Sequence, residues 1–349
     1  MIVSVSGFGW SGSGAVLDLL REYSDLEVAF DGWNVDPEFI LLAEVDGIKD
    51  LDYQLTERPS RISSYLAIQR FRDLVKAYNK YMLVDQVFDG KLLKITEDYI
   101  NKLVDFKFDG ATYHEYYQTS PIMIKYNYLI TRLLHNRLSR FFFKDAYKRF
   151  LYEKVTEMSV SYKPCHFFEI TKEYLNSIFS FLWKNKDLPL VFDQMFPADN
   201  PLPFMRYLED ARCIVVRRDP RDTYILAKKI YNSSIPIPTE SVESFVCFYR
   251  KIIYETKVKD TPTILNIQYE DLIYCYDETK AKIEEFLGIS CHINPKVKFN
   301  PAISANNTQL YKKYKEYTAE IKKIEKSLPD SLYPFDLKPQ VNTSGSSVF

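Results

Sequence analysis

The sequence predicts an α/β fold in which a parallel sheet is flanked by helices, with a large helical insertion in the chain. Short apolar runs rich in β-branched residues alternate with amphipathic stretches, as expected for parallel strands joined by helices. From about residue 60 to 186, long amphipathic stretches replace this alternation. The 349 residues suffice for a large buried core. We therefore expect a single three-layer domain at 1–338, an insertion at about 60–186 and a flexible tail at 339–349.

The chain opens with a strand, a glycine-rich turn and a helix. Ile2–Val5 is a short β-branched run, and Ala15–Tyr23 carries apolar residues on one helical face. Between them, Ser6–Gly14 contains four glycines, which let the backbone approach a ligand closely. In a strand–turn–helix unit, backbone N–H groups and the helix N-terminus point to one place and attract an anion. The stretch therefore predicts a phosphate-binding loop, the alternative being a turn that only connects a strand to a helix.

The loop lacks the lysine of the nucleoside-triphosphate pattern G-x-x-x-x-G-K-[ST]. Gly7 and Gly12 have the required spacing, but Ser13 stands where that pattern has lysine. Without the lysine charge the loop is a poor site for a triphosphate, although its backbone can still hold a phosphate. A P-loop-type sheet is therefore expected, and a nucleotide kinase remains an alternative function.

Composition restricts the partners and the compartment. The net charge of −1 gives no general affinity for nucleic acid or for an acidic membrane surface. The 27 tyrosines and 24 phenylalanines suit a packed core or an aromatic acceptor pocket. The five cysteines are scattered and lack metal spacing, so we expect them to be reduced and buried. No signal peptide or membrane span is predicted, and we expect a cytoplasmic protein.

The insertion follows a second predicted strand at Leu26–Phe30. On the ligand side of an open sheet, such an insertion commonly builds a specificity pocket or lid, and a packing role is the alternative. Its amphipathic stretches are Tyr65–Tyr81, Glu97–Phe106, Ile122–Tyr152 and Lys172–Trp183.

The α/β pattern returns after the insertion. An apolar strand at Leu188–Gln194 ends in polar residues, and Cys213–Val216 is the strongest strand of the chain. The second of these runs into Arg217–Asp222, and Pro220 suits the first turn of a following helix. Three arginines at the carboxyl end of a buried strand favour an anion site, although they could instead pair with nearby aspartates.

The remaining elements complete the predicted sheet. We expect a helix at Ser241–Glu255 and a strand at Thr263–Ile267. A helix at Glu278–Leu287 should stop at Gly288, and a charged helix is expected at Gln309–Leu328.

Four separated segments together resemble the sulfotransferases that use 3′-phosphoadenosine 5′-phosphosulfate (PAPS), in particular bacterial ones. Ser11–Ala15 resembles the family's 5′-phosphosulfate loop, and Arg218–Asp222 resembles its 3′-phosphate element R-[DN]-P-[RK]-D. Tyr269–Leu272, with Phe286–Gly288 behind it, resembles the Y-E-D-L step and the helix ending F-L-G. Phe299–Pro301, with Ser304–Thr308, is similar to the loop that closes over the nucleotide. The resemblance covers the α/β core but not the insertion.

The resemblance implies a role for each matching residue. Ser11, Gly12, Ser13 and Gly14 would hold the 5′-phosphosulfate, with Gly9, Trp10 and Ala15 beside them. Arg218 would bind the 3′-phosphate, with Arg221 nearby, because guanidinium geometry favours bidentate contact. Tyr269 would contact the adenine. The implied reaction moves a sulfuryl group from PAPS, without a metal, to a hydroxyl of a glycan or small-molecule alcohol in polysaccharide biosynthesis or small-molecule sulfation.

Three positions depart from the family pattern. Trp10 stands where a lysine or arginine is common, and Leu226 stands where a serine is common. Asp193-Gln194 occupies the place of a frequent histidine base. Arg217, Arg221, Lys228 or Arg132 could supply the missing charge. These departures leave open a catalytically inactive nucleotide-binding relative.

The proton of the acceptor hydroxyl needs a base, an effect typically worth about 10²–10⁴-fold in rate. Asp193 is the first candidate because it ends the strand expected beside the arginine strand, and partial burial would raise its pKa. Glu44 and Glu38 are further candidates, because some carbohydrate sulfotransferases use a glutamate in that region. His135 and His114 lie in the insertion and could face the acceptor.

The acceptor is left open between two chemistries. A charged glycan would suit the basic residues of the insertion, and an apolar alcohol would suit aromatic walls such as Phe141–Phe143. Both features could belong to the two faces of one helix. The basic residues are Arg132, Arg137, Arg140, Lys144, Lys148 and Arg149.

Overall fold

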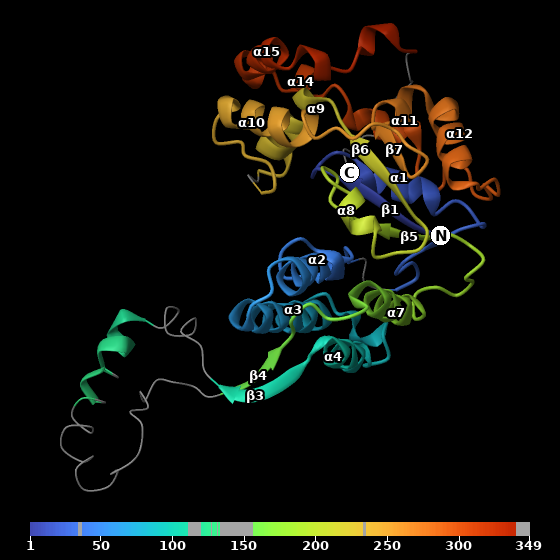
Figure 1. The fold of residues 1–349 in the computed structure, drawn as a ribbon. Coiled ribbons are helices and arrows are strands. Elements are labelled where there is room, and N and C mark those ends of the chain that lie inside the picture. Colours follow the sequence, from blue (N-terminus) through green and yellow to red (C-terminus); the bar gives the residue numbers. More distant parts are fainter. Residues whose placement is uncertain are drawn as a thin grey trace, which may run out of the picture.

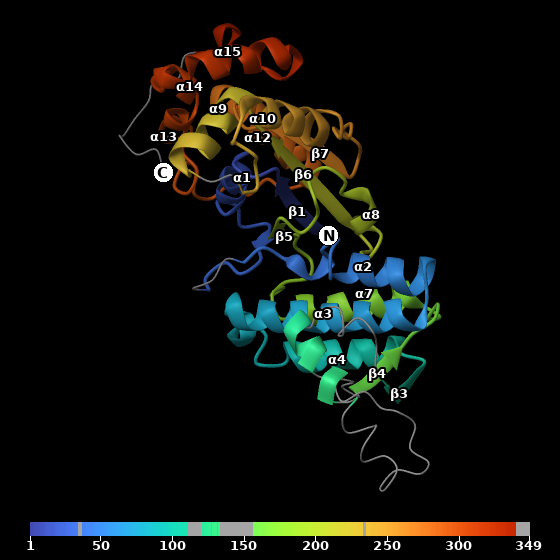
Figure 2. The ribbon, with the colours of Figure 1, turned by 90° about the vertical axis from the view of Figure 1, so that its left-hand side faces the viewer.

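The computed structural model of the chain describes residues 1–33, 37–110, 120–126, 128–130, 132, 156–232 and 235–339. A lobe built around the sheet carries the C-terminal helices, and a helical lobe lies beside it (Figure 1). The same two lobes are seen in the perpendicular view (Figure 2).

The sheet has five parallel strands in the order β2-β5-β1-β6-β7. Because the chain first builds the β2/β5 side and later the β6/β7 side, the strand order reverses at the central β1. Ligands of open α/β sheets bind at the carboxyl ends of the strands at such a reversal. The predicted α/β class is confirmed. The strands are β1 (Ile2–Gly7), β2 (Glu27–Val28), β5 (Leu190–Asp193), β6 (Ala211–Arg217) and β7 (Ile264–Gln268).

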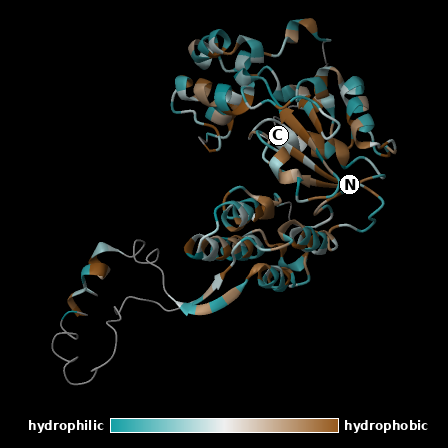
Figure 3. Ribbon diagram, viewed as in Figure 1, coloured by the Kyte–Doolittle hydropathy of each residue, from teal (hydrophilic) through white to brown (hydrophobic). Residues whose placement is uncertain are grey.

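Alternate residues of the central strands point to opposite faces of the sheet. Val3 and Val216 pack with helix α1 (Ser13–Leu20) and helix α12 (Tyr276–Leu287) on one face. On the other face, Cys213 and Val215 belong to a core cluster that extends into the helical lobe. The strands are accordingly among the most apolar ribbons of the fold (Figure 3).

The helical lobe includes helices α2, α3, α4 and α7 and the antiparallel strand pair β3–β4. The stretch Glu97–Phe106 was expected to be helical throughout. Helix α4 ends at Leu103, and strand β3 begins at Phe106. Most of the stretch Ile122–Tyr152 lies outside the described residues. The elements are α2 (Ile48–Asp52), α3 (Arg61–Tyr81), α4 (Leu92–Leu103), β3 (Phe106–Gly110), β4 (Thr156–Val160) and α7 (Phe167–Phe179).

Helix α7 lies close to the amino end of β1. Its residues Lys172 and Asn176 line a small cavity together with Met1, Ile2 and Asp210. The predicted anion loop is at the other end of the same strand. Within the described residues, this helix therefore contributes to packing, and the lid function of the insertion stays a prediction.

A buried carboxylate joins the helical lobe to the sheet lobe. Asp52 of α2 is fully buried and accepts hydrogen bonds from Arg206 Nη2 at 2.5 Å and from the Tyr207 hydroxyl at 2.5 Å. Arg206 and Tyr207 follow helix α8 (Leu202–Met205), between β5 and β6. The Thr56 hydroxyl donates to the other carboxylate oxygen at 2.9 Å. Both carboxylate oxygens of Asp52 therefore have hydrogen-bond partners.

The C-terminal half departs from prediction where helices were expected to run on. The helix expected from Pro220 is α9 (Pro220–Ile225) followed by a π-helical turn, Leu226–Ile230. The helix expected at Ser241–Glu255 likewise changes from α10 (Val242–Phe248) to a π-helical turn, Tyr249–Tyr254. The helix expected at Gln309–Leu328 is broken, because Tyr314 has non-helical backbone angles. Its parts are α14 (Leu310–Lys313) and α15 (Thr318–Ser327), and short helices α11 (Asp271–Tyr274) and α13 (Pro301–Ser304) precede them.

The expectation of five buried cysteines is wrong. All five thiols are free, but only Cys213, on strand β6, is buried. Cys165, Cys247 and Cys291 are exposed because they lie on loops or on the outer face of a helix. Within the described ranges, no helix combines the length and the apolar character needed to span a bilayer.

We predict that Asp52→Ala destabilises the protein by about 2 kcal/mol, because the fully buried Tyr207 hydroxyl loses its acceptor, whereas Arg206 is partly exposed to solvent. Chemical denaturation should show the loss as a lower midpoint. The control is Asp73→Ala on α3, whose carboxylate forms an exposed pair with Lys76 at 3.4 Å. That change should leave the midpoint almost unaltered. Equal effects of the two substitutions would contradict the anchoring role of Asp52.

Candidate functional site

The loop after β1 has the backbone shape that its glycines allow. Gly9 and Gly12 have φ angles of 74° and 90°, and Trp10 between them has a φ of 53°. Gly12 is also in close contact with the ring of Tyr269, so a side chain at this position would collide with that ring. Glycine at position 12 is therefore required both by its φ angle and by the close approach of Tyr269.

The N–H groups of the loop are available to a ligand. Phe8 N–H donates to Ser11 Oγ at 3.2 Å, and Ala15 N–H donates to the Gly12 carbonyl at 3.1 Å. Between them, the N–H groups of Gly9 to Gly14 have no hydrogen-bond partner among the described residues. Successive unpaired N–H groups leading into a helix form an anion site.

Gln194 holds the loop from the neighbouring strand. It follows β5, and its Oε1 accepts the Gly7 N–H at 3.0 Å. Its Nε2 donates to Ser13 Oγ at 3.1 Å. One side chain therefore connects the start of the loop to the start of α1. The sequence marked Gln194 only as standing where the family has a histidine, and its position at the end of a buried strand was the signal of a site residue.

Arg218 lies against the loop from the other side. It follows β6, and it is 4% exposed. Its Nη1 donates to the Trp10 carbonyl at 3.2 Å, and its Nη2 donates to the Asn307 carbonyl. The guanidinium carbon lies 4.4 Å from the centroid of the Tyr269 ring. Nε is buried and has no partner among the described residues, so its N–H can be donated to an anion.

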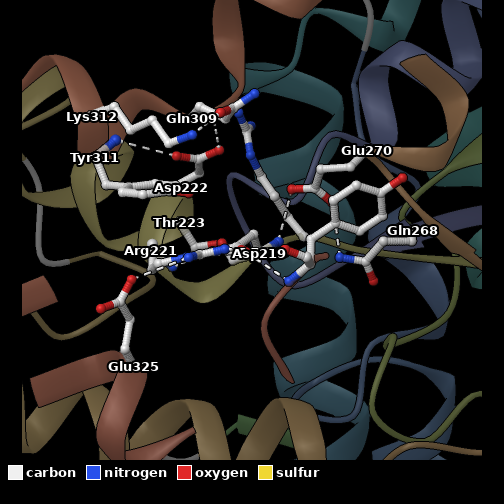
Figure 4. Close-up of polar contacts among 12 residues, drawn as sticks. Asp219, Arg221, Asp222, Thr223, Gln268, Glu270, Gln309, Tyr311, Lys312 and Glu325 are labelled. Carbon is white, nitrogen blue, oxygen red and sulfur yellow. Dashed lines mark hydrogen bonds and ion pairs between the residues drawn. The ribbon is translucent and has the colours of Figure 1, made fainter. Parts of the chain in front are cut away.

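Three fully buried carboxylates, those of Asp219, Asp222 and Glu270, lie near the carboxyl ends of β6 and β7 (Figure 4). Asp219 pairs with Arg221 at 2.7 Å, and its N–H donates to Glu270 Oε1 at 2.9 Å. Asp222 accepts the Gln309 N–H at 2.7 Å, which fixes the segment before α14. The carboxylates therefore tie the end of β6 to the C-terminal part of the chain.

Burial changes the ionisation of two of these carboxylates. It raises the pKa of Asp222 to about 7, against an opposing effect of the Arg218 charge. It also raises the pKa of Glu270 to about 8, and the negative charge of Asp219 adds to that rise. Protons on these groups reduce the negative charge beside Arg218, which favours an external anion at its guanidinium.

Arg221 is engaged by the protein. Its Nε and Nη2 bind Asp219, and its Nη1 donates to Glu325 Oε1 at 3.2 Å. Nη2 also donates to the Tyr333 carbonyl at 3.2 Å, and the guanidinium stacks over Tyr311. These contacts hold α15 and the following segment against α9. They correspond to the aspartate pairing that the sequence left open as the alternative for the arginines.

The other candidates occupy different positions. Asp193 is the last residue of β5, half-buried and in register with Val5 of β1. Glu44 and Glu38 are exposed, before α2. Lys228 donates to the Thr239 carbonyl at 2.5 Å, and Arg132 is exposed. His135 and His114 lie outside the described residues.

Trp10 forms an aromatic wall at the loop. Its indole stacks on the Tyr231 ring with a centroid distance of 3.7 Å and an interplanar angle of 9°. The neighbouring Gly9 is in close contact with Pro236. Trp10, at the position where the resemblance led us to look for a basic residue, thus supplies a flat surface in place of a charge.

No protein-family model and no curated protein matches the chain. Among solved structures, the sulfotransferase domain of the Synechococcus PCC 7002 olefin synthase is 12% identical, with a TM-score of 0.38 over 86% of this chain and 75% of that one. The sulfotransferase domain of the curacin biosynthetic pathway is 14% identical, with a TM-score of 0.35 over 95% of this chain and 98% of that one. A Mycobacterium tuberculosis sulfotransferase is 11% identical, with a TM-score of 0.33 over 94% of this chain and 76% of that one.

We predict that the protein loses stability as the pH rises from about 5 to 8. The native state keeps protons on Asp222 and Glu270 that the unfolded chain releases near its ordinary carboxyl pKa, so a rise in pH favours unfolding. Melting temperatures measured across this range should fall. In Asp222→Asn the fall should be smaller, because the amide does not titrate. A slope identical in both proteins would contradict the prediction.

Proposed function

We propose that the protein is a sulfotransferase that moves the sulfuryl group of PAPS to a hydroxyl group of an acceptor. One observation carries the proposal: Arg218 Nη1 lies 3.2 Å from the carbonyl oxygen of Trp10, inside the glycine loop. Two anion-binding groups, from the ends of adjacent strands, therefore meet at one place. A nucleotide with phosphate groups on both its 3′ and 5′ positions requires such a pair.

The proposed roles follow from the contacts. The unpaired N–H groups from Gly9 to Gly14 hold the 5′-phosphosulfate, with Ser13 oriented by Gln194. Arg218 binds the 3′-phosphate through Nε and through donors that now bond to carbonyl groups. Tyr269 is 3% exposed, and its hydroxyl donates to the Ser304 carbonyl at 3.4 Å. A contact between Tyr269 and adenine therefore requires the segment around Ser304 to move.

The transfer itself requires positioning and charge stabilisation. Asp193, the proposed base, takes the proton of the acceptor hydroxyl, and the oxygen attacks the sulfur. The bond between sulfur and the bridging phosphate oxygen breaks, and adenosine 3′,5′-bisphosphate leaves. The loop N–H groups stabilise the negative charge that spreads over the sulfuryl and phosphate oxygens. Glu44 and His135 remain the alternative bases, and no metal has a role in the proposal.

The direct test is a transfer assay with PAPS labelled in its sulfuryl group, using glycans and small alcohols as acceptors. Label should appear in an acceptor. Turnover should fall at least about 100-fold in Asp193→Asn if Asp193 is the base. Label transfer to no acceptor, combined with binding of ATP in preference to adenosine 3′,5′-bisphosphate, would favour the kinase alternative.

We predict that Arg218→Ala weakens binding of adenosine 3′,5′-bisphosphate at least about 100-fold, because a buried charge-assisted contact is lost. Calorimetric titration measures the affinity. Arg250→Ala is the matched control, since Arg250 is exposed and its Nη2 donates to the Ser327 carbonyl at 2.8 Å. Its affinity should equal that of the parent protein. Unchanged affinity in a folded Arg218→Ala variant would remove Arg218 from the site.

We also predict that Gln194→Glu harms donor binding more than Gln194→Ala does. Alanine removes the connection between Gly7 and Ser13, whereas glutamate can still accept the Gly7 N–H but adds negative charge beside the anion site. The KM for PAPS should therefore rise most in the glutamate variant. The opposite order would mean that the connection matters more than the charge.

A further inference from the structure

A pocket lies at the carboxyl ends of β6 and β7, and none of the loop residues Ser6–Gly14 lines it. It has a volume of about 330 Å³, at the small end of the range for ligand sites. Arg217, the last residue of β6, lines it together with Gln268, the last residue of β7. Because Arg217 and Arg218 are consecutive in an extended segment, their side chains point to opposite faces of the sheet. The pocket is therefore on the other face from Arg218.

Arg217 is a buried cation without a carboxylate partner among the described residues. It is 7% exposed, its Nε donates to Asn266 Oδ1 at 3.3 Å, and its Nη1 donates to the Ile253 carbonyl. Nη2 is buried and has no partner within the described part of the chain. Burial lowers the pKa of Arg217 to about 10. A guanidinium in this position is stabilised by an anion.

The other charged groups of the pocket leave the charge of Arg217 uncompensated. Asp271 accepts a hydrogen bond from the Tyr333 hydroxyl at 2.7 Å and pairs with Lys338 at 3.1 Å. Lys257 adds a positive charge, and Asp330 is the remaining carboxylate in the wall. Basic groups thus outnumber acidic ones. Tyr249 and Tyr254 add aromatic surface to the same wall.

We propose that this pocket binds a small organic anion, with its phosphate or carboxylate group against Arg217 and its apolar part against the tyrosines. A charged oxyanion would meet the unpartnered Nη2, and guanidinium geometry suits both oxyanions. The volume admits one small molecule. The Arg217 guanidinium lies 4.9 Å from the centroid of the Phe8 ring in the loop, but no loop residue lines the pocket. The proposal therefore does not depend on the sulfotransferase assignment.

The test is calorimetric titration of the full chain with phenyl phosphate, benzoate and inorganic phosphate. We expect phenyl phosphate or benzoate to bind more tightly than inorganic phosphate, and Arg217→Gln to weaken that binding at least about tenfold. Stronger binding of phenyl phosphate than of benzoate would identify a phosphate site, and the reverse a carboxylate site. Arg250→Gln should bind like the parent. No binding of the aromatic anions below about 10 mM would overturn the proposal.

Two further variants separate this pocket from the loop and from effects on folding. Arg218→Ala should still bind the aromatic anion, so the result holds whether or not the protein uses PAPS. Lys338→Gln, at a less buried position, should weaken binding severalfold even if Arg217→Gln does not fold. Equal affinity in the parent and in folded Arg217→Gln, or loss of binding only in Arg218→Ala, would contradict the proposal.

Discussion

The structure of the site depends on one buried guanidinium placed between two segments of backbone. Arg218 donates to the carbonyl of Trp10 in the loop and to the carbonyl of Asn307 in the C-terminal segment. Neither acceptor is a carboxylate, so the positive charge stays available while the geometry is fixed. The Tyr269 ring supports the guanidinium and at the same time packs on Gly12. Loop, arginine and C-terminal segment are therefore held as one unit.

The sheet topology brings these parts together. Strands β5, β1 and β6 are adjacent, so Gln194, the loop and Arg218 come from three neighbouring strand ends. The buried carboxylates near Arg218 then fix the last part of the chain. Asp222 accepts the Gln309 N–H. Asp219 pairs with Arg221 and accepts the Tyr333 N–H at 2.8 Å. Because the pKa values of Asp222 and Glu270 are raised, the protonation of these two carboxylates depends on the charges near Arg218.

Much of the arrangement could be predicted from the sequence, because it depends on local signals. The glycines after Ile2–Val5 and the arginines after Cys213–Val216 marked two strand ends, and the structure brings both together. The role of Gln194 could not be predicted, since it depends on the order of strands in the sheet. The resemblance singled out Arg218, but the sequence did not show what Arg217 and Arg221 contact. Their partners lie up to 112 residues away, as with Tyr333 for Arg221. The break at Tyr314 likewise has no local signal, since Gln309–Leu328 contains neither glycine nor proline.

The most direct test is the number of protons exchanged when adenosine 3′,5′-bisphosphate binds at pH 8, obtained from calorimetry in buffers of different ionisation enthalpy. At this pH the phosphates are already fully ionised. If the 3′-phosphate meets Arg218 beside the buried carboxylates, their pKa values rise further and the complex takes up protons. Proton uptake that shrinks in Asp222→Asn would support the account. Tight binding without any proton uptake would contradict it.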